Sequence, residues 1–484
     1  MNLKYYCTCL TAVILTFHVF TVSAKDYTAG FFGIEPGGTV LNTRAIQFGI
    51  DYISENGGGR LVFPTGRYLT GCIHLKSDVT LQLDKGAVLL GSTNPLDYDR
   101  QNTPFDHNFQ TSLALILGLN QRNIGITGQG EIDGQGKALA AAVGELVKKG
   151  LIKDRSVSRP DEDKRPMIIN FFGCDDVTVK TITLKNSACW VECYNKCKNV
   201  IVDSIRVESR AFWNNDGIDI VDCTNFKVSN SYFNCSDDGI CLKSLDPDAA
   251  NENILIQNNS MTTEASGIKF GTASLGGFKN IRILNNKVFD TNRSAIALEA
   301  VDGATIENIE VDGIVGINIG NAIFLRAGAR KGSRKGKVEN VSIQNVNVEI
   351  RTEKNPLKAM PGIVIGGMPD QIISKVKLKN VVIKLPGGAE KAAAKISIDN
   401  LKDIPEKPDS YPEYNMFGEL PSWGVFIRHA QNVQVEGLSI TAAKADFRTA
   451  IVLDDVHQSG FKKLSVKEPQ AKKKIFIANS SGIK

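Results

Sequence analysis

Histidine and long apolar runs are scarce in this chain of 484 residues. The five histidines are scattered, and one of them, His18, lies close to the N-terminus, which disfavours a zinc site. Beyond the N-terminal stretch no segment stays apolar for the roughly 18 residues that a membrane-spanning helix needs. The net charge of +5 comes from interspersed signs. That pattern lacks the basic footprint of a nucleic-acid-binding protein but is compatible with an anionic substrate.

The N-terminal stretch predicts a signal peptide over residues 1–24. Residues 1–4 carry a positive charge, residues 9–22 are apolar, and Val22-Ser23-Ala24 has the small-residue pattern of a cleavage site. The apolar run is too short and too close to that site for a membrane span. We therefore expect an exported mature protein, periplasmic or extracellular.

Eight of the ten cysteines lie after this signal. Export permits disulfides, and the spacing of Cys189, Cys193 and Cys197 is where one is expected. Cys223 and Cys241 each lie in an apolar run and are expected in the core.

Aromatic residues make up only 7% of the chain, whereas glycine occurs 44 times. This balance favours a chain with many tight turns. The length exceeds that of a usual single domain, but repeat architectures grow by adding units rather than by enlarging one core.

Residues 25–95 are predicted to form an N-terminal cap region. Apolar residues recur at helical spacing over residues 44–53, and three glycines, Gly57-Gly58-Gly59, end that helix. Strand-like runs follow at residues 60–63, 67–69 and 79–83. A helical cap of this kind covers the open edge of a stacked β structure.

Residues 136–165 interrupt the pattern as a surface insertion. Residues 138–149 are rich in alanine and helical in pattern, and residues 153–164 are charged, contain Pro160 and predict a loop. A long insertion in a regular array usually lies on the binding face.

A column of Asn and Asp residues marks a repeat. Each member opens a short strand, and the intervals run from 23 to 32 residues through Asp176, Asn199, Asn225, Asn253, Asn280, Asn308 and Asn340. Earlier and later members are Asp78, Asn123, Asn380 and Asn432. Asn and Asp tolerate the left-handed backbone conformation, so the column predicts a recurrent turn.

A second column follows the first in each repeat. Its members are Asp216-Gly-Ile, Asp238-Gly-Ile, Ser266-Gly-Ile, Ser294-Ala-Ile and Asn321-Ala-Ile, with Ser187-Ala188-Cys189 as the expected preceding member. Repeats of several short strands that stack to bury a continuous aliphatic core predict an all-β parallel β-helix. Residues 25–484 are expected to form this one domain.

Strand alternation predicts which side chains of the second column point outward. Those three and five residues after the turn residue are expected to face solvent as the wall of a groove: Asp219, Cys241, Lys269, Lys243, Glu299 and Arg326.

Three carboxylates in this column are the candidates for catalysis: Asp216, Asp237 and Asp238. An isolated Asp-Gly is more often only a turn. Later repeats, however, make the same turn with Ser or Asn, so the turn does not require a carboxylate. Neighbouring strands lie about 4.8 Å apart, and like charges that close raise one pKa, as a general acid requires.

These motifs resemble glycoside hydrolase family 28, the polygalacturonase and rhamnogalacturonase family of pectin hydrolases. The resemblance covers nearly all of the mature chain, and its most specific part is the Asn-x-Asp followed by Asp-Asp. The other shared segments are Asn42-Thr43-Arg44-Ala45-Ile46, Tyr68-Leu69-Thr70-Gly71, Leu90-Gly91-Ser92, Tyr411-Pro412-Glu413-Tyr414, Phe417-Gly418-Glu419-Leu420-Pro421 and Ile427-Arg428-His429.

The resemblance implies a right-handed, pectate-lyase-like β-helix and an inverting mechanism without cofactor or metal. By position, Asp237 would protonate the glycosidic oxygen, and Asp216 and Asp238 would activate the attacking water. Asn214 would orient that water or an aspartate. A polysaccharide or oligosaccharide is the implied partner, and a monomer is expected.

Two family motifs are missing. The Gly-His-Gly of polygalacturonases falls at Ala265-Ser266-Gly267, and their Arg-Ile-Lys falls near Ala297-Leu298-Glu299. Either Lys269, Arg293 and Arg326 grip an anionic sugar from new positions, or Glu299 indicates a neutral sugar beside the cut. A rhamnogalacturonan-type substrate is favoured over homogalacturonan.

Two other functions remain open at this point. A polysaccharide lyase on the same fold would use Lys243 or Lys269 as its base, with Ca²⁺ on the acidic cluster. A non-catalytic glycan-binding solenoid would use the aspartates only as turn residues. In any of these, Trp213 is a candidate platform for stacking a sugar, whereas His429 is expected to be structural.

Overall fold

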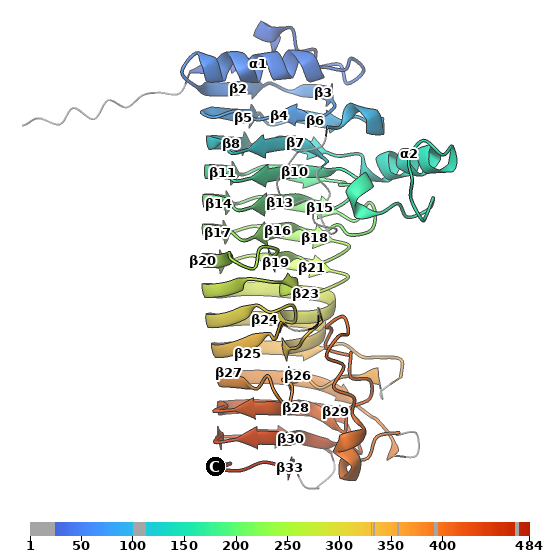
Figure 1. The fold of residues 1–484 in the computed structure, drawn as a ribbon, viewed down its shortest axis with the longest axis vertical. Helices are drawn as coiled ribbons and strands as arrows, with labels where there is room; N and C mark the ends of the chain where they lie inside the picture. Colours follow the sequence, from blue (N-terminus) through green and yellow to red (C-terminus); the bar gives the residue numbers. More distant parts are fainter. Residues whose placement is uncertain are drawn as a thin grey trace, which may run out of the picture.

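Short parallel strands stacked along one axis form the body of the protein (Figure 1). The structure is a computed structural model that describes residues 25–99, 113–330, 332, 334–355, 358–391, 395–469 and 474–484. The predicted signal peptide lies outside these residues. Within them, no helix is long and apolar enough to cross a membrane.

The strands fall on three faces of the stack, and successive rungs pair in parallel on each face. The first face begins at β1 and β2 and consists of β1 (Asp26–Thr28), β2 (Gly59–Phe63), β5 (Val79–Leu83), β8 (Arg122–Gly128), β11 (Asp175–Lys180), β14 (Lys198–Asp203), β17 (Thr224–Ser229), β20 (Ala250–Gln257) and β31 (Gly460–Lys462). The second face consists of β3 (Gly66–Thr70), β6 (Ala87–Gly91), β9 (Glu131–Asp133), β12 (Thr183–Lys185), β15 (Arg206–Ser209), β18 (Tyr232–Cys235), β21 (Ser260–Thr263) and β32 (Ser465–Lys467).

The third face carries the candidate catalytic residues. It consists of β4 (Ile73–His74), β7 (Ala114–Leu119), β10 (Met167–Phe172), β13 (Glu192–Asn195), β16 (Ile218–Val221), β19 (Ile240–Ser244), β22 (Ile268–Ser274), β26 (Ile363–Gly366), β28 (Ser422–Gln431), β30 (Thr449–His457) and β33 (Ile475–Ala478). Five longer strands bend from one face to another: β23 (Gly277–Ala300), β24 (Thr305–Ala327), β25 (Lys337–Ile350), β27 (Ile373–Gly387) and β29 (Gln434–Lys444).

The helices lie at the edges of this stack. Helix α1 (Thr43–Glu55) covers its first rung and packs on β2, β4 and β5, and α2 (Gly136–Lys148) projects to one side (Figure 1). The helices predicted over residues 44–53 and 138–149 are therefore present as α1 and α2. Four short 3-10 helices complete the described regular structure: η1 (Ala29–Phe32), η2 (Pro95–Asp97), η3 (Glu162–Lys164) and η6 (Ile398–Asp403).

The predicted column of turn residues is confirmed throughout the stack. Every member adopts the left-handed conformation, with φ between 52° and 65°: Asp78, Asn123, Asp176, Asn199, Asn225, Asn253, Asn280, Asn308, Asn340, Asn380 and Asn432. Several also bond to each other from rung to rung. Asn225 Nδ2, for example, donates to Asn199 Oδ1 at 3.1 Å. The short polar side chain satisfies both the backbone conformation and its neighbour.

The second column is a stack of buried isoleucines on the third face. Ile218, Ile240, Ile268, Ile296 and Ile323 pair in register and are each 0% exposed. The predicted preceding member, Ser187-Ala188-Cys189, is wrong. Asp219 pairs with Cys193, so Glu192 precedes Ile218 in the stack, because the turn into β13 is three residues longer than expected. The stack buries its methyl groups continuously, and each isoleucine contributes about 1.5–3 kcal/mol.

The predicted disulfide is also wrong. All eight cysteines in the described ranges are free and buried, including Cys189, Cys193 and Cys197. Cys223 belongs to the aliphatic core as expected. Cys241 is buried but points outward, with its Sγ 3.0 Å from Lys243 Nζ.

Shortening one isoleucine of the stack tests how much the register depends on it. Ile268→Ala leaves a cavity between two rungs and should lower the free energy of unfolding by about 2–5 kcal/mol, seen as a lower urea midpoint. Ile201→Ala on β14 is the matched control, because Ile201 points outward and is 38% exposed. Equal midpoints for the two variants would contradict the assigned core.

Candidate active site

The three candidate aspartates lie together on the third face. Asp216 and Asp238 each come two residues before a stacked isoleucine, and Gly217 N donates to Asp238 O at 2.9 Å. They therefore occupy neighbouring rungs, as predicted. Asp216 and Asp238 are each 4% exposed, whereas Asp237 is partly exposed. Asp237 is thus the carboxylic acid of the three that a ligand reaches most easily.

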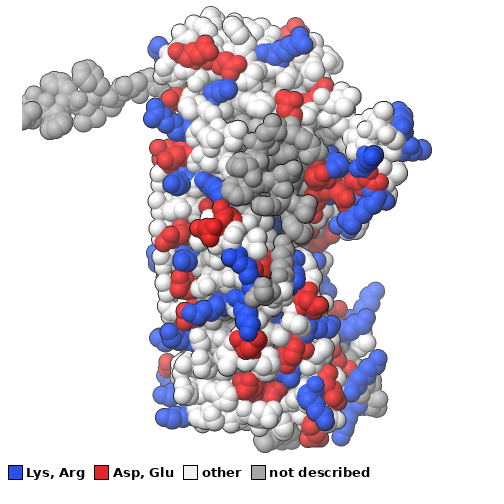
Figure 2. All heavy atoms as spheres, in the orientation of Figure 1, with Lys and Arg blue, Asp and Glu red and all other residues white. Residues whose placement is uncertain are grey.

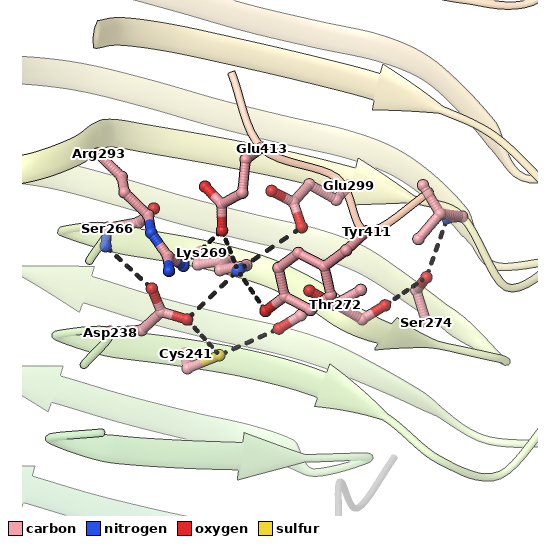
Figure 3. A network of polar contacts seen from close by, with 12 residues as sticks. Asp238, Cys241, Ser266, Lys269, Thr272, Ser274, Arg293, Glu299, Tyr411 and Glu413 are labelled. Atoms are coloured by element: carbon pink, nitrogen blue, oxygen red, sulfur yellow. Dashed lines mark hydrogen bonds and ion pairs between the residues drawn. The ribbon is translucent and has the colours of Figure 1, made fainter. Parts of the chain in front are cut away.

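Two buried lysines neutralise much of this acidic cluster. Lys243 Nζ lies 2.9 Å from Asp216 Oδ2 and also pairs with Asp219. It sits over the ring of Trp190, 4.3 Å from the centroid. Lys269 Nζ lies 3.5 Å from Asp238 Oδ2, 3.3 Å from Glu413 Oε1 and 3.9 Å from Glu299 Oε2 (Figure 3).

The aspartates differ in the direction of their pKa. Burial raises the pKa of Asp237 well above its usual range, and the charges of Asp216 and Asp238 raise it further. Burial also acts on Asp238, but the nearby Lys269 and Arg293 outweigh it and lower its pKa. The pKa values of these two adjacent carboxyl groups are therefore shifted in opposite directions.

Asp216 lies between these two cases. Burial raises its pKa, and the charge of Lys243 opposes that rise. The hydrogen bond from Lys243 stabilises the ionised form of Asp216. Asp216 therefore has a lysine partner of its own, just as Asp238 has Lys269.

The expectation that the outward positions face solvent is wrong. Asp219, Cys241, Lys269, Glu299 and Arg326 are 0% exposed, and Lys243 is 9% exposed. They do point out of the β-helix, but residues 396–420 lie over part of the third face. Aromatic and aliphatic side chains of this segment form a second hydrophobic cluster with outward residues of the strands: Phe324, Val364, Leu401, Ile404, Tyr414, Met416, Phe417 and Leu420.

Arg326 is not available to grip a substrate. Its guanidinium donates to the carbonyl oxygens of Gly366, Gly367, Glu406 and Lys407, and it lies against the ring of Phe417. These contacts attach the covering segment to the stack. The predicted substrate-binding role of Arg326 is therefore wrong.

Glu299 and Lys269 are also removed from direct substrate contact. Both carboxylate oxygens of Glu299 are buried without a hydrogen bond, and burial raises its pKa well above the usual range. Lys269 lies beneath Tyr411, whose hydroxyl is 3.3 Å from its Nζ (Figure 3). Because both side chains are buried, Glu299 cannot contact a neutral sugar and Lys269 cannot contact an anionic one.

Arg293 is the predicted cation that stays partly accessible, with 36% of its side chain exposed. It pairs with Glu413 and lies close enough to Asp237 and Asp238 that their charges raise its pKa. Its position beside Asp237 suits a contact with a bound anion.

Asn214 and Trp213 lie just before Asp216 at the edge of the groove. Asn214 has φ 58° and its Oδ1 accepts from Arg165 Nη2 at 2.9 Å. Trp213 is 57% exposed, but Arg159 lies 4.6 Å from its ring centroid. One face of the predicted sugar platform therefore holds an arginine.

His429 has the expected structural place. Its two ring nitrogens contact Asp455 at 2.6 Å and Glu406 at 3.0 Å. Both carboxylates raise its pKa against the opposing effect of burial.

Part of this cluster has the side chains of a possible cation site. Ligand atoms of Asp216, Asp238 and Cys241 lie within 4.8 Å of one another. The ammonium groups of Lys243 and Lys269 already contact these two carboxylates. A divalent ion there would meet two fixed positive charges, so the residues do not fit a metal well.

Several groups of the site come from distant loops and could not be placed there from the sequence. Tyr411 and Glu413 are 142 and 144 residues from Lys269, and Arg165 is 49 residues from Asn214. Tyr411 and Glu413 lie in a segment that resembled the family, but no spacing rule placed them over Lys269. A buried Arg in a charged loop gave no signal of its own.

Comparisons with known proteins identify the family and the fold. The sequence profile described as "Glycosyl hydrolases family 28" matches residues 56–403. A "Probable polygalacturonase" of Vitis vinifera is 26% identical over 344 residues, which cover 68% of this chain and 62% of that protein. An "Exo-poly-alpha-D-galacturonosidase" of Dickeya chrysanthemi is 30% identical over 244 residues, 43% of this chain and 40% of that protein. The chain thus spans less than two thirds of either relative.

Solved structures share the fold. The family 28 exopolygalacturonase of Yersinia enterocolitica aligns with a TM-score of 0.71 at 18% identity, over 96% of this chain and 78% of that one. The exopolygalacturonase of Thermotoga maritima aligns with a TM-score of 0.63 at 23% identity, over 75% and 88%. The parallel β-helix class is confirmed, while its right-handed sense stays a prediction. Because the family profile matches most of this chain, residues 56–403, the chain belongs to glycosyl hydrolase family 28.

Proposed function

We propose that the protein is an inverting glycoside hydrolase that cleaves a pectic polysaccharide or oligosaccharide of the galacturonan or rhamnogalacturonan type. The observation that carries the proposal is the geometry of the three aspartates: Asp237 is partly exposed, the adjacent Asp238 is buried and paired with Lys269, and Asp216 lies one rung away. The opposite directions of the pKa shifts at Asp237 and Asp238 support this division of roles. Glycoside hydrolysis by inversion needs one protonated carboxyl group and one carboxylate. The names of the relatives support a pectic substrate.

In the proposed mechanism Asp237 donates its proton to the glycosidic oxygen as the bond to the anomeric carbon breaks. Asp238 and Asp216 accept a proton from a water molecule, whose oxygen attacks the anomeric carbon from the opposite face. Lys269 and Lys243 stabilise the two carboxylates in their ionised form. The product has the inverted anomeric configuration.

The lyase alternative is disfavoured by the state of its proposed bases. Lys243 and Lys269 are buried, which alone would lower their pKa, but their carboxylate partners raise it well above the usual value. Protonated lysines cannot abstract the C5 proton of a uronide. Lys269 is in addition 0% exposed.

The accessible acid is tested by Asp237→Asn. The amide keeps the shape of the side chain but cannot give up a proton, so kcat on pectic oligosaccharides should fall by about 100- to 10,000-fold with binding retained. Reducing-sugar release and NMR of the anomeric signals measure the loss and the stereochemistry.

Asp176→Asn is the matched control for this variant. Asp176 is an exposed member of the turn column in which most other rungs carry Asn, so the same chemical change should leave kcat unchanged. Full activity of Asp237→Asn, or retained configuration in the wild-type product, would contradict the proposed mechanism.

The role of Lys269 is tested by the pH dependence of kcat/KM. Asp238 must be ionised to accept a proton, so activity is lost as the pH falls through its pKa. Lys269→Met removes the cation that holds this pKa down, and the acidic limb of the profile should move up by about 1–3 pH units. Lys269→Arg, which keeps the charge, should leave the limb in place.

The outcome is informative only for a folded variant, which circular dichroism establishes. An unmoved acidic limb in folded Lys269→Met would show that Asp238 does not depend on Lys269 for its ionisation.

A further inference from the structure

A cavity of about 410 Å³ lies between the loop that follows α2 and the start of the catalytic rung. It is lined by Arg155, Ser156, Arg159, Pro160, Asp161, Glu162, Arg165 and Asn214. In Figure 2 the surface formed by α2 and this loop carries blue and red side chains close together. The cavity is polar, with arginine as its most frequent lining residue.

The loop around the cavity is held in a defined shape by its own hydrogen bonds. Asp154 accepts from Ser156 N at 2.9 Å and from Asp161 N at 2.8 Å. Ser156 Oγ accepts in turn from Arg159 N at 3.0 Å. A wall built this way is organised before a ligand arrives, which lowers the entropy cost of binding.

Arg165 attaches this loop to the catalytic rung. It is 1% exposed and donates to Pro160 O within the loop at 2.8 Å. Its other nitrogens donate to Trp213 O at 2.8 Å and to Asn214 Oδ1 at 2.9 Å. Asn214, which lines the cavity, is two residues before Asp216, and the charge of Asp216 acts on Glu162 in the same cavity, so the cavity lies close to Asp216.

The charges of the cavity leave one cation free for a ligand. Arg155 pairs with Asp161 at 2.8 Å, and the donors of Arg165 are occupied as described. Arg159 forms no ion pair within the described ranges, and its guanidinium rests 4.6 Å from the ring centroid of Trp213. Stacking fixes the plane of the guanidinium while leaving its N–H groups at the edge for an acceptor.

The two acids of the cavity do not cancel this cation. Asp161 is engaged by Arg155. Glu162 forms no ion pair with Arg159 among the described residues; burial and then the charge of Asp216 raise its pKa, against the smaller opposing effects of Arg165, Lys243 and Arg159. The cavity therefore favours an anionic group that presents two oxygens in one plane, which is the geometry of a carboxylate.

We propose that this cavity is a subsite for the carboxylate-bearing sugar next to the cleaved bond, with Arg159 as the residue that binds the carboxylate. Trp213 then serves as the platform for Arg159 rather than for a sugar. The cavity offers anion recognition beside the rung of Asp216, three rungs before the position of the missing Arg-Ile-Lys. This inference rests on the proposed hydrolase function and names one recognition element of its substrate.

The test compares Arg159→Gln with wild type on oligogalacturonides and rhamnogalacturonan oligosaccharides, each as free acid and as methyl ester. Loss of one charge-assisted contact should raise KM for the free acid by about 10- to 100-fold. The value for the ester and kcat should stay within about twofold of wild type. Arg159→Lys should recover part of the affinity.

Arg206→Gln is the matched control. Arg206 also lies over an aromatic ring, Tyr232 at 4.4 Å, but on the second face and outside this cavity. It should leave both KM values unchanged. Trp213→Leu should raise KM for the free acid less than Arg159→Gln does, because it loosens the guanidinium without removing it.

Calorimetry with the Asp237→Asn protein separates this inference from the proposed function. If wild type cleaves no pectic glycan but Asp237→Asn binds the free acid through Arg159, only the hydrolase proposal fails. If the enzyme cleaves its glycan and Arg159→Gln changes neither KM nor binding, only the subsite is overturned. Equal weakening for acid and ester, or no binding of the acid at all, overturns it as well.

Discussion

The parallel register between β16 and β19 places every proposed reacting group. Gly217 N and Ile218 N donate to the carbonyl oxygens of Asp238 and Gly239, and this pairing sets Asp216 against Asp238 on one edge. A slip by one residue would turn the buried isoleucines outward and would no longer place Asp216 opposite Asp238. The hydrophobic stack therefore fixes the chemistry, because the cost of exposing the isoleucines holds the carboxylates in place.

The same rungs carry an unusual density of buried charge. Two lysines and several carboxylates lie together beneath loops, and each ion depends on its partners, since an unpaired buried charge is strongly destabilising. This mutual dependence separates the aspartates by role. Asp238 has Lys269 close by, whereas burial and then the like charges of Asp216 and Asp238 raise the pKa of Asp237.

The sequence predicted the features that repeat. The turn column, the isoleucine stack and the meeting of Asp216 with Asp238 all follow from a fixed period and strand alternation. It could not predict which outward residues are covered, because the cover comes from residues 396–420 and from the insertion, where no period applies. Alternation therefore predicts that Lys269, Glu299 and Arg326 form the wall of a groove, although in the structure all three are buried beneath the covering segment. Arg159 and Arg165 belong to no repeating pattern, because they lie in or next to a charged loop without periodicity.

The covering segment, residues 396–420, also affects when the site is completed during synthesis of the chain. The two neighbouring rungs that hold Asp238 and Lys269 are synthesised more than 140 residues before Tyr411 and Glu413. A growing chain can stack its aspartates early, but Lys269 then faces water, and screening weakens its hold on Asp238. The final electrostatic state is reached only when the C-terminal rungs have stacked and brought their loop back over the middle of the molecule. The acid–base properties of this site therefore depend on residues that are synthesised long after the aspartates themselves.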